Sequence, residues 1–422
     1  MREMKDSGIE WIGNVPATWE RCKIKNVISS IGSGTTPTSS NIDYYNSEDI
    51  CWIQSGDLYK TSYISNTAVS LSAKALHLSA LQIYAAPFIV VAMYGASVGN
   101  IAISTIDACS NQACCCIKPD NNNDLKFMYY WLSMCKIDFL SQSIGGGQPN
   151  ISQSKIKNQF YYRPQLSEQK VIANFLDSKC SEIDAISADI QKEIEILEQY
   201  KRSVITEAVT KGLNPDVEMK DSGVPWIGKM PANWTCIKGK YILKYMQKPV
   251  KTDDGVITCF RDGEVTLRSN RREDGFTMAD KEIGYQGIDV GDLVVHGMDG
   301  FAGAIGISDS RGKASPVLNV LDSRQNKKYI MYYLRSMAYG DVFAALATGI
   351  RVRSCDLRWN KLSVLLYPVP PLEEQAEIVQ YIEDTLNKVN GVISEKKQQL
   401  TVIDSYKKSL IYEYVTGKKE AL

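Results

Sequence analysis

Two kinds of hydrophobic pattern alternate along the chain. Short apolar runs broken by glycine occur at residues 87–104 and 292–308. Their β-branched residues and glycines predict strands joined by tight turns. Longer segments with almost no glycine or proline follow at residues 170–211 and from about 374 to 416. The chain is therefore expected to form β-rich parts, each followed by a long helix.

Both long segments carry apolar residues at heptad spacing. A heptad repeat predicts a coiled-coil seam, although ordinary core packing of an amphipathic helix is the alternative explanation. A helix from Ser178 to Lys211 would be about 50 Å long. Glu193 and Lys396 are polar intrusions in the stripe, and Gly391 weakens the second copy. The seam residues are Ile183, Ile186, Ile190, Leu197, Tyr200 and Val204 in the first segment, and Leu386, Ile393, Leu400, Ile403 and Leu410 in the second.

The two halves of the chain repeat each other. The phrase MKDSGIEWIGNVPATW, from Met4 to Trp19, returns as MKDSGVPWIGKMPANW from Met219 to Trp234. FMYYWLSM is matched by IMYYLRSM, PQLSEQ by PPLEEQ, and Tyr200-Lys201 by Tyr406-Lys407, in the same order and at nearly constant spacing. Such ordered matches indicate a tandem duplication. We expect an α+β fold of two β-rich heads related by a pseudo-twofold axis, with their long helices paired antiparallel as a rigid rod.

Composition and charge limit the classes of protein that remain. A chain of 422 residues with 44% hydrophobic and 23% charged residues is expected to form two or three globular domains. The charged N-terminus is unlike a secretory signal, and the longest apolar run, about Ala85 to Met93, is too short to span a bilayer. A soluble, cytoplasmic protein is expected. Because the net charge is +0, nucleic-acid binding would need local basic patches or charge from partners.

Residues for catalysis or metal binding are scarce. The run Cys114 to Cys116 cannot pair within itself without strain, no CxxC pair exists, and the histidines are His77 and His296 alone. Reduced, mostly buried thiols and no metal site are therefore expected. The stretch Gly306 to Ala314 departs from a phosphate-binding loop in its glycine spacing and lacks the hydroxyl after Lys313. The pattern favours a binding protein over an enzyme.

The loops of the two halves offer chemistry suited to DNA. Hydroxyls, amides and glycines suit close approach to phosphate and base edges in the first half, whereas arginine, the commonest guanine reader, dominates the second. Each loop has solvated surface as its alternative explanation. The candidate DNA-contacting residues are Ser33, Thr35, Thr36, Gln54, Ser97, Gln148 and Asn150 in the first half, and Arg261, Arg268, Arg271, Arg272, Arg351 and Arg353 in the second.

These motifs together resemble a known family. The doubled Ser-Gly-x-x-Trp-Ile-Gly opening, the Gly-Thr-x-Pro-Thr stretch and the paired phrases at Leu166 to Gln169 and Leu372 to Gln375 are similar to the specificity (S) subunits of type I restriction-modification systems. The resemblance covers essentially the whole chain. The second half departs from it where Lys248-Pro249-Val250-Lys251 stands near the place of the Gly-Thr-x-Pro-Thr stretch.

The resemblance implies domains and partners. Residues 1–159 and 218–364 would be target recognition domains, and residues 160–217 and 365–422 conserved regions with spacer helices. The protein would be a non-catalytic subunit that reads an asymmetric, bipartite site in double-stranded DNA. It would dock two methyltransferase subunits and, in the full complex, restriction subunits, with S-adenosylmethionine, ATP and Mg on those partners and no cofactor on this chain. Apolar helix residues including Ile194, Ile205 and Ile411 would be exposed for partner helices.

Two other classes of protein stay open from the residues alone. A fused restriction enzyme is disfavoured because two recognition units leave no residues for a methylase or nuclease domain. A coiled-coil scaffold with two protein-binding heads would more often expose aromatic residues than the polar and arginine-rich loops found here.

Overall fold

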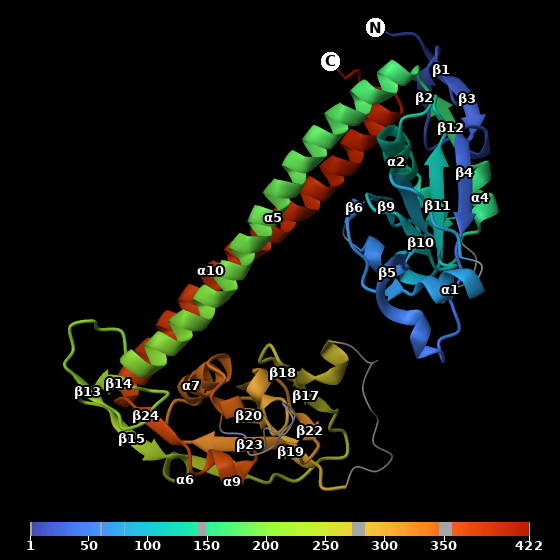
Figure 1. Cartoon of the computed structure of the whole chain (residues 1–422). Helices are drawn as coiled ribbons and strands as arrows, with labels where there is room; N and C mark the ends of the chain where they lie inside the picture. The colour runs from blue at the N-terminus through green and yellow to red at the C-terminus, as the bar shows by residue number, and fades with distance from the viewer. Residues whose placement is uncertain are drawn as a thin grey trace. The chain divides into compact units, whose positions relative to one another are not determined.

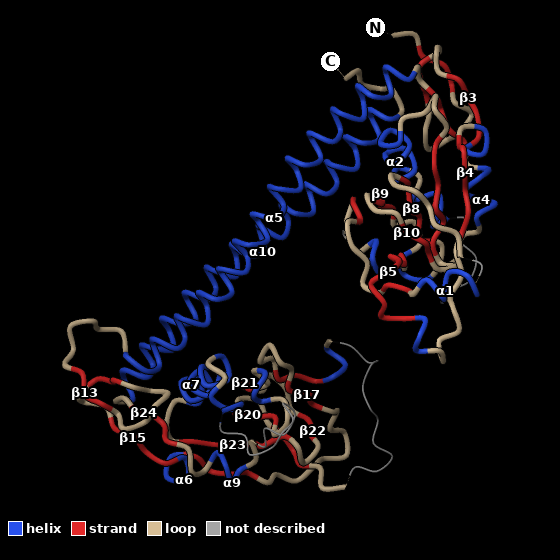
Figure 2. The backbone as a smooth tube through the Cα atoms, in the orientation of Figure 1, coloured by secondary structure: helices blue, strands red, loops and turns tan. Residues whose placement is uncertain are grey.

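The computed structural model describes residues 2–59, 61–79, 81–141, 149–271, 283–345 and 357–421. The chain folds into two compact units. Unit 1 comprises residues 1–189 and 398–422, and unit 2 comprises residues 190–397. Each unit combines short strands with helices, and two long helices run from one unit into the other (Figures 1 and 2). The expected α+β architecture of two β-rich domains joined by long helices is confirmed.

Unit 1 is built on a five-stranded sheet of order β4-β11-β8-β9-β6. β11 lies between β4 and β8, and all its pairings with them are antiparallel. Helix α2 packs on this sheet through the buried Phe127 and Trp131. The elements are β1 (Met4–Asp6), β2 (Asn14–Pro16), β3 (Glu20–Lys23), η1 (Ile24–Asn26), β4 (Ile28–Ser33), η2 (Ile42–Tyr44), β5 (Tyr45–Ile53), η3 (Ser55–Leu58), β6 (Tyr63–Ile64), β7 (Ser70–Leu71), α1 (Ala73–Leu78), β8 (Phe88–Ala92), η4 (Gly95–Ser97), β9 (Ile101–Ser104), β10 (Ala108–Ser110), β11 (Cys114–Pro119), α2 (Leu125–Met134), α3 (Lys136–Ser141), α4 (Gln153–Asn158), β12 (Phe160–Arg163) and α5 (Leu166–Lys211).

Unit 2 repeats this plan with a four-stranded sheet of order β16-β23-β20-β21. Helix α7 packs on it through the buried Tyr329 and Tyr333, at the places that Phe127 and Trp131 occupy in unit 1. The elements are β13 (Met219–Asp221), β14 (Lys229–Pro231), β15 (Thr235–Lys238), α6 (Gly239–Ile242), β16 (Leu243–Met246), β17 (Ile257–Cys259), β18 (Val265–Leu267), η5 (Arg268–Asn270), β19 (Gln286–Ile288), β20 (Leu293–His296), η6 (Gly300–Ala302), β21 (Ile305–Ile307), β22 (Gly312–Ala314), β23 (Leu318–Ser323), α7 (Lys327–Tyr339), α8 (Val342–Ala345), α9 (Trp359–Leu362), β24 (Leu366–Val369) and α10 (Leu372–Val415).

Helices α5 and α10 pair antiparallel. In unit 1 the start of α5 meets the end of α10, where the Phe175 and Tyr414 rings lie 4.4 Å apart. In unit 2 the end of α5 and the start of α10 share one apolar core, to which Ile205 and Ile378 belong. The first long helix begins at Leu166, well before Ser178 where the sequence pattern placed its start. Gly391 lies inside α10 without interrupting it.

The expected seam is partly right. Ile183, Val204, Ile393 and Leu410 are buried, and Ile190, Leu197, Leu400 and Ile403 are half-buried. Ile186 and Tyr200, expected inside the seam, are 51% and 48% exposed. The seam has a first row, the heptad series that contains Ile183 and Ile190. Its second row lies four residues after the first, not three, and includes Cys180, Ser187, Ile194 and Lys201. The expectation that Ile194 and Ile205 are exposed is therefore wrong, because both are buried within the chain itself.

The polar intrusions in the seam form ion pairs between the helices. Lys396 of α10 donates to Glu193 of α5 in unit 2. In unit 1 the Lys407 ammonium lies 2.6 Å from the Asp184 carboxylate. The lysine stems cover apolar surface while their charged ends reach the flanking acid of the other helix. A shift of one turn would separate both pairs, so they favour a single register.

The repeated Glu-Gln phrase anchors each long helix to its domain. Gln169 is fully buried, accepts the Asp124 N–H at 2.8 Å and donates to the Pro164 carbonyl at 2.9 Å. Gln375 repeats this arrangement with Asn326 and Pro370. The neighbouring glutamates accept the indole N–H groups of the repeated tryptophans, Trp19 to Glu168 and Trp234 to Glu374. The Glu-Gln phrase, which carries the strongest sequence signal, therefore has a structural role: it holds each long helix to its domain.

The doubled opening phrase receives the end of a long helix in each unit. Gly417, just after α10, has a positive φ of 68°, and an added Cβ would lie 2.4 Å from the Pro16 ring. Gly212, just after α5, has a φ of 74° and approaches the equivalent Pro231 and Trp234. Only glycine adopts this left-handed conformation at no steric cost. The phrase occurs twice because, in each unit, it forms the surface against which the end of a long helix packs.

Candidate nucleic-acid interface

In unit 1 the predicted DNA-contacting loops meet at one end of the five-stranded sheet. Gly34, just after β4, donates its N–H to the Ser110 hydroxyl at 3.1 Å. In the loop after β10, the Asn111 N–H donates a hydrogen bond to the carbonyl of Ile53, at the end of β5, at 3.0 Å. The Met93 N–H, directly after β8, donates to the Ala113 carbonyl of the same loop at 2.7 Å. The ends of four strands therefore hold these loops together.

The candidate side chains of the first half line this end. Ser33 and Thr36 are exposed, Thr35 is half-buried, and the Thr36 hydroxyl donates to Gln112. Ser97 donates to the Tyr94 carbonyl at 2.9 Å, and Asn150 forms a β-bridge with Tyr94. Gln54 precedes η3, which contacts η4. Gln148 lies outside the described residues. The sequence analysis missed the exposed Tyr94, whose backbone contacts both Ser97 and Asn150.

In unit 2 three of the predicted arginines share one hollow of about 630 Å³. Its wall includes the buried apolar side chains of Ile257, Cys259 and Leu318. Its rim carries Arg261, Arg268 and Arg271 together with Asp262, His296 and Asp299. Arg272, Arg351 and Arg353 lie outside the described residues. Spacing in the sequence did not mark His296 or Asp299. His296 ends β20 and Asp299 follows it, as Ala92 ends β8 and Gly95 follows it in the first repeat.

The arginines of the hollow differ in how they are held. Arg271 contacts two carboxylates, Asp262 at 2.5 Å and Glu264 at 3.1 Å, and stacks over the Phe260 ring. Arg261 pairs with Asp299 at 2.9 Å, and its side chain is 62% exposed. The Arg268 Nε donates to the Thr258 hydroxyl at 3.4 Å. Arg271 thus braces the β17–β18 hairpin, whereas Arg261 is oriented and accessible.

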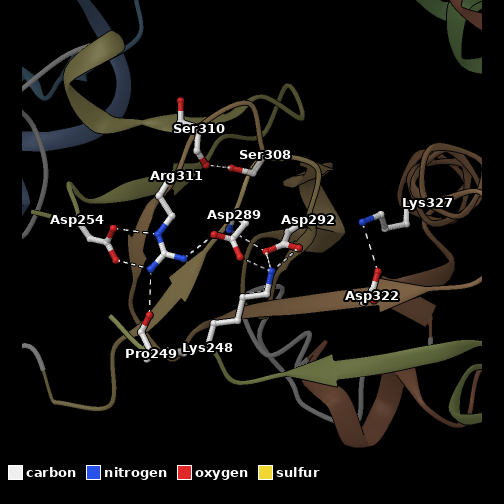
Figure 3. A network of polar contacts seen from close by, with 10 residues as sticks. All are labelled: Lys248, Pro249, Asp254, Asp289, Asp292, Ser308, Ser310, Arg311, Asp322 and Lys327. Atoms are coloured by element: carbon white, nitrogen blue, oxygen red, sulfur yellow. Dashed lines mark hydrogen bonds and ion pairs between the residues drawn. The ribbon is translucent and has the colours of Figure 1, made fainter. Parts of the chain in front are cut away.

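A half-buried ion network fixes the loop that replaces the Gly-Thr-x-Pro-Thr stretch (Figure 3). Lys248 contacts Asp289 at 2.8 Å and Asp292 at 2.7 Å. Arg311 contacts Asp254 at 2.7 Å and Asp289 at 2.5 Å. Its guanidinium also donates to the Pro249 carbonyl at 3.0 Å. Both cations are therefore committed to holding the loop.

The network predicts an acid-sensitive stability for unit 2. Hydrogen bonds from Lys248 and then Arg311 lower the pKa of Asp289 to about 2. A carboxylate with a lowered folded-state pKa contributes stability above its unfolded pKa, and this contribution is lost as the pH falls toward 2. Asp289→Asn should therefore unfold earlier in urea than the wild type at pH 7, with a difference that shrinks between pH 5 and pH 3. Asp253→Asn, an exposed neighbour outside the network, should show no such trend; a constant difference for Asp289→Asn would contradict the prediction.

The cysteines of the described residues are free thiols, and those in strands β10 and β11 are buried. Burial raises the pKa of Cys109 to about 11 and that of Cys116 to about 12. Such thiols stay protonated and unreactive at neutral pH. Within the described ranges, no cluster of histidine, cysteine and acidic side chains could hold a metal ion. In the same part of the chain, no helix is long and apolar enough to cross a membrane.

Comparison with known proteins finds a matching domain and several similar chains. Residues 16–196 match a model described as the type I restriction modification DNA specificity domain. The chain is 25% identical over 312 residues to the type I restriction enzyme MjaVIII specificity subunit of Methanocaldococcus jannaschii, covering 69% of each chain. It is 21% identical over 275 residues to the StySPI specificity subunit of Salmonella potsdam, covering 61% of this chain and 57% of that one.

Solved structures show the same fold. A chain from a type I R-M system complex superposes with a TM-score of 0.68 at 12% identity, covering 95% of this chain and 98% of that one. The HsdS subunit from Thermoanaerobacter tengcongensis gives a TM-score of 0.50 at 13% identity, covering 96% and 98%. These similarities define a DNA specificity domain in the first half. The second half repeats the sheet order and helix anchors of the first, and the chain is similar over about two thirds of its length to type I specificity subunits.

Proposed function

We propose that this chain is the non-catalytic DNA-reading subunit of a type I complex and that each unit reads one half of an asymmetric, bipartite site. The supporting observation is that two domains of one architecture present chemically different loops at equivalent places. Unit 1 offers hydroxyl and amide groups such as Ser97 and Asn150, whereas unit 2 offers the accessible guanidinium of Arg261. Direct readout depends on which donors and acceptors reach the base edges. Different loops therefore imply different half-site sequences.

The long helices would set the unread gap between the half-sites. α5 and α10 are continuous and belong to both units, and their seam is fixed by Lys396–Glu193 and Lys407–Asp184. Because the register of α5 against α10 is fixed, the helix pair has a single length. Half-sites read by two coupled domains are separated by distances that the protein geometry dictates. The spacer would therefore be constant.

The exposed apolar residues of the helices would bind two methyltransferase subunits. They come in matched positions of the repeat, Ile186 with Val392, Ile196 with Val402, and Tyr200 with Tyr406, all separated by the same interval. Each residue of these pairs is more than 40% exposed. Exposed apolar groups of this kind mark interaction surfaces, and a duplicated surface suits two copies of one partner. Restriction subunits would join the full complex, and S-adenosylmethionine, ATP and Mg²⁺ would bind to the partners.

A DNA-modification assay tests this proposal. The chain would be expressed with the methyltransferase subunits of its system in a host without DNA methylation, and the genomic DNA would be sequenced for N6-methyladenine. One split motif of two defined parts around a fixed gap is expected. Methylation at a continuous motif would contradict the two-domain mechanism, and a stable complex that leaves DNA unmodified and unbound would favour a scaffold.

A further inference from the structure

The rim of the unit 2 hollow contains a side-chain relay that starts at His296. This imidazole ends β20 and is largely shielded from solvent. Its Nδ1 accepts the backbone N–H of Met298 at 3.2 Å and that of Asp299 at 2.9 Å. Because Nδ1 is an acceptor, the proton of the neutral ring lies on Nε2. His296 thereby fixes the turn that carries Asp299.

The backbone around this turn is fixed from both sides. Asn319 donates to the Val295 carbonyl at 3.1 Å and to the Leu357 carbonyl at 3.0 Å. Gly303 has a φ of 94°, and a Cβ there would lie 2.7 Å from the Arg261 carbonyl. The Arg261 backbone and the η6 turn can approach this closely only because residue 303 is glycine. The two ends of the relay are therefore held at a set distance.

Asp299 orients Arg261. One guanidinium nitrogen, Nη2, donates to Asp299 Oδ1 at 2.9 Å, and among the described residues this is the carboxylate that Arg261 contacts. One hydrogen bond to a fixed acid limits the directions of the long side chain, while no other described side chain takes up its remaining N–H groups. An arginine ordered before binding loses less side-chain entropy on contact. Arg271 differs, because two carboxylates and an aromatic ring already occupy it.

We infer that Arg261 is a guanine-reading, specificity-determining residue of unit 2, and that Asp299 and His296 are its positioning residues. This inference rests on the proposed DNA-reading function. The planar arginine fork donates in parallel to the O6 and N7 acceptors of guanine in the major groove, a geometry that the point charge of a lysine ammonium matches less well. In the equivalent turn of unit 1, Ala92 and Gly95 stand in place of His296 and Asp299, so the relay belongs to one half-site.

The test selects DNA with the purified complex of this chain and its methyltransferase subunits. A pool of randomised duplexes would be enriched on the wild type and on Arg261→Ala, Arg261→Lys, His296→Asn and His296→Phe. The wild type is expected to enrich a split motif with a guanine in one half. Both Arg261 variants should lose about 5- to 100-fold discrimination at that guanine and keep the other positions. Arg261→Lys retains the charge, so its affinity for DNA of unrelated sequence should change little.

The His296 variants separate positioning from general structure. An asparagine oxygen can accept the same two N–H groups, as it does in turns, so His296→Asn should retain the guanine. His296→Phe removes the acceptor and should relax the same base as Arg261→Ala. An unchanged motif in both Arg261 variants, or a uniform loss at every position, would overturn the inference. If His296→Phe left that guanine intact, the positioning role would be wrong. Failure of the wild type to enrich any split motif would count against the proposed function itself.

Discussion

Replacing both Tyr200 and Tyr406 by glutamate is expected to strip the methyltransferase subunits from the complex. The two tyrosines are 48% and 58% exposed and occupy equivalent positions of α5 and α10. Buried tyrosines are frequent hot spots whose loss costs 2 kcal/mol or more, and a charge in an apolar contact adds to that cost. Each site should bind its partner at least ~30-fold more weakly. Mass measurement of the assembled complex should show the free chain, and either single variant should retain one partner copy.

A matched pair of control sites lies on the other side of the helices. Ala188 and Ser394 are exposed, are equivalent in the repeat and follow the seam residues Ser187 and Ile393 by one position. The heptad places them away from the tyrosine side. Ala188→Glu with Ser394→Glu should leave two partners bound. If the control pair released the partners equally, or if the tyrosine pair released none, the docking surface would have to be placed elsewhere.

The repeat and the long helices could be predicted because they depend on local patterns. Period-seven apolar residues such as Ile183 and Val204 are buried as expected. The sequence pattern misplaces the second row of the seam, because Ser187 and Lys201 are polar and hydrophobicity does not mark them. It indicates the adjacent apolar residues Ile186 and Tyr200 instead. Whether an apolar residue on such a helix faces the other helix or solvent depends on a shift of a single position, which composition does not reveal.

The candidate interface was predictable by residue type but not by arrangement. Ser33, Thr36, Ser97 and Asn150 come from separate loops that meet only because strand ends of two sheets converge. The arginine-rich segment pointed to unit 2, yet sequence could not show that Asp262 and Glu264 engage Arg271. Nor could it show the role of His296, which acts through backbone N–H groups at a turn. Contacts of this kind depend on tertiary structure rather than on spacing.

Gly34→Ala is expected to impair the half-site read by unit 1. An added Cβ at Gly34 would lie 1.5 Å from the backbone carbonyl oxygen of Ser110, which belongs to β10 and cannot yield as a flexible side chain could. The Ser33–Thr36 loop must then move off the sheet end. Overpacking of this kind costs about 1–3 kcal/mol, or several degrees in the unfolding temperature of a domain of this size. Gly56→Ala is the matched control, because nothing lies within 4 Å of its added Cβ.

The decisive measurement is the motif that each variant complex enriches from randomised duplexes. Gly34→Ala should lose at least tenfold discrimination in one half of the split site and keep the other, while Gly56→Ala keeps both. Arg261→Ala should act on the opposite half, because Gly34 and Arg261 belong to different units. If the two variants relaxed the same half, one unit would be reading both parts of the site. The duplicated sheet with its two sets of loops is best explained if the two effects fall on opposite sides of the gap.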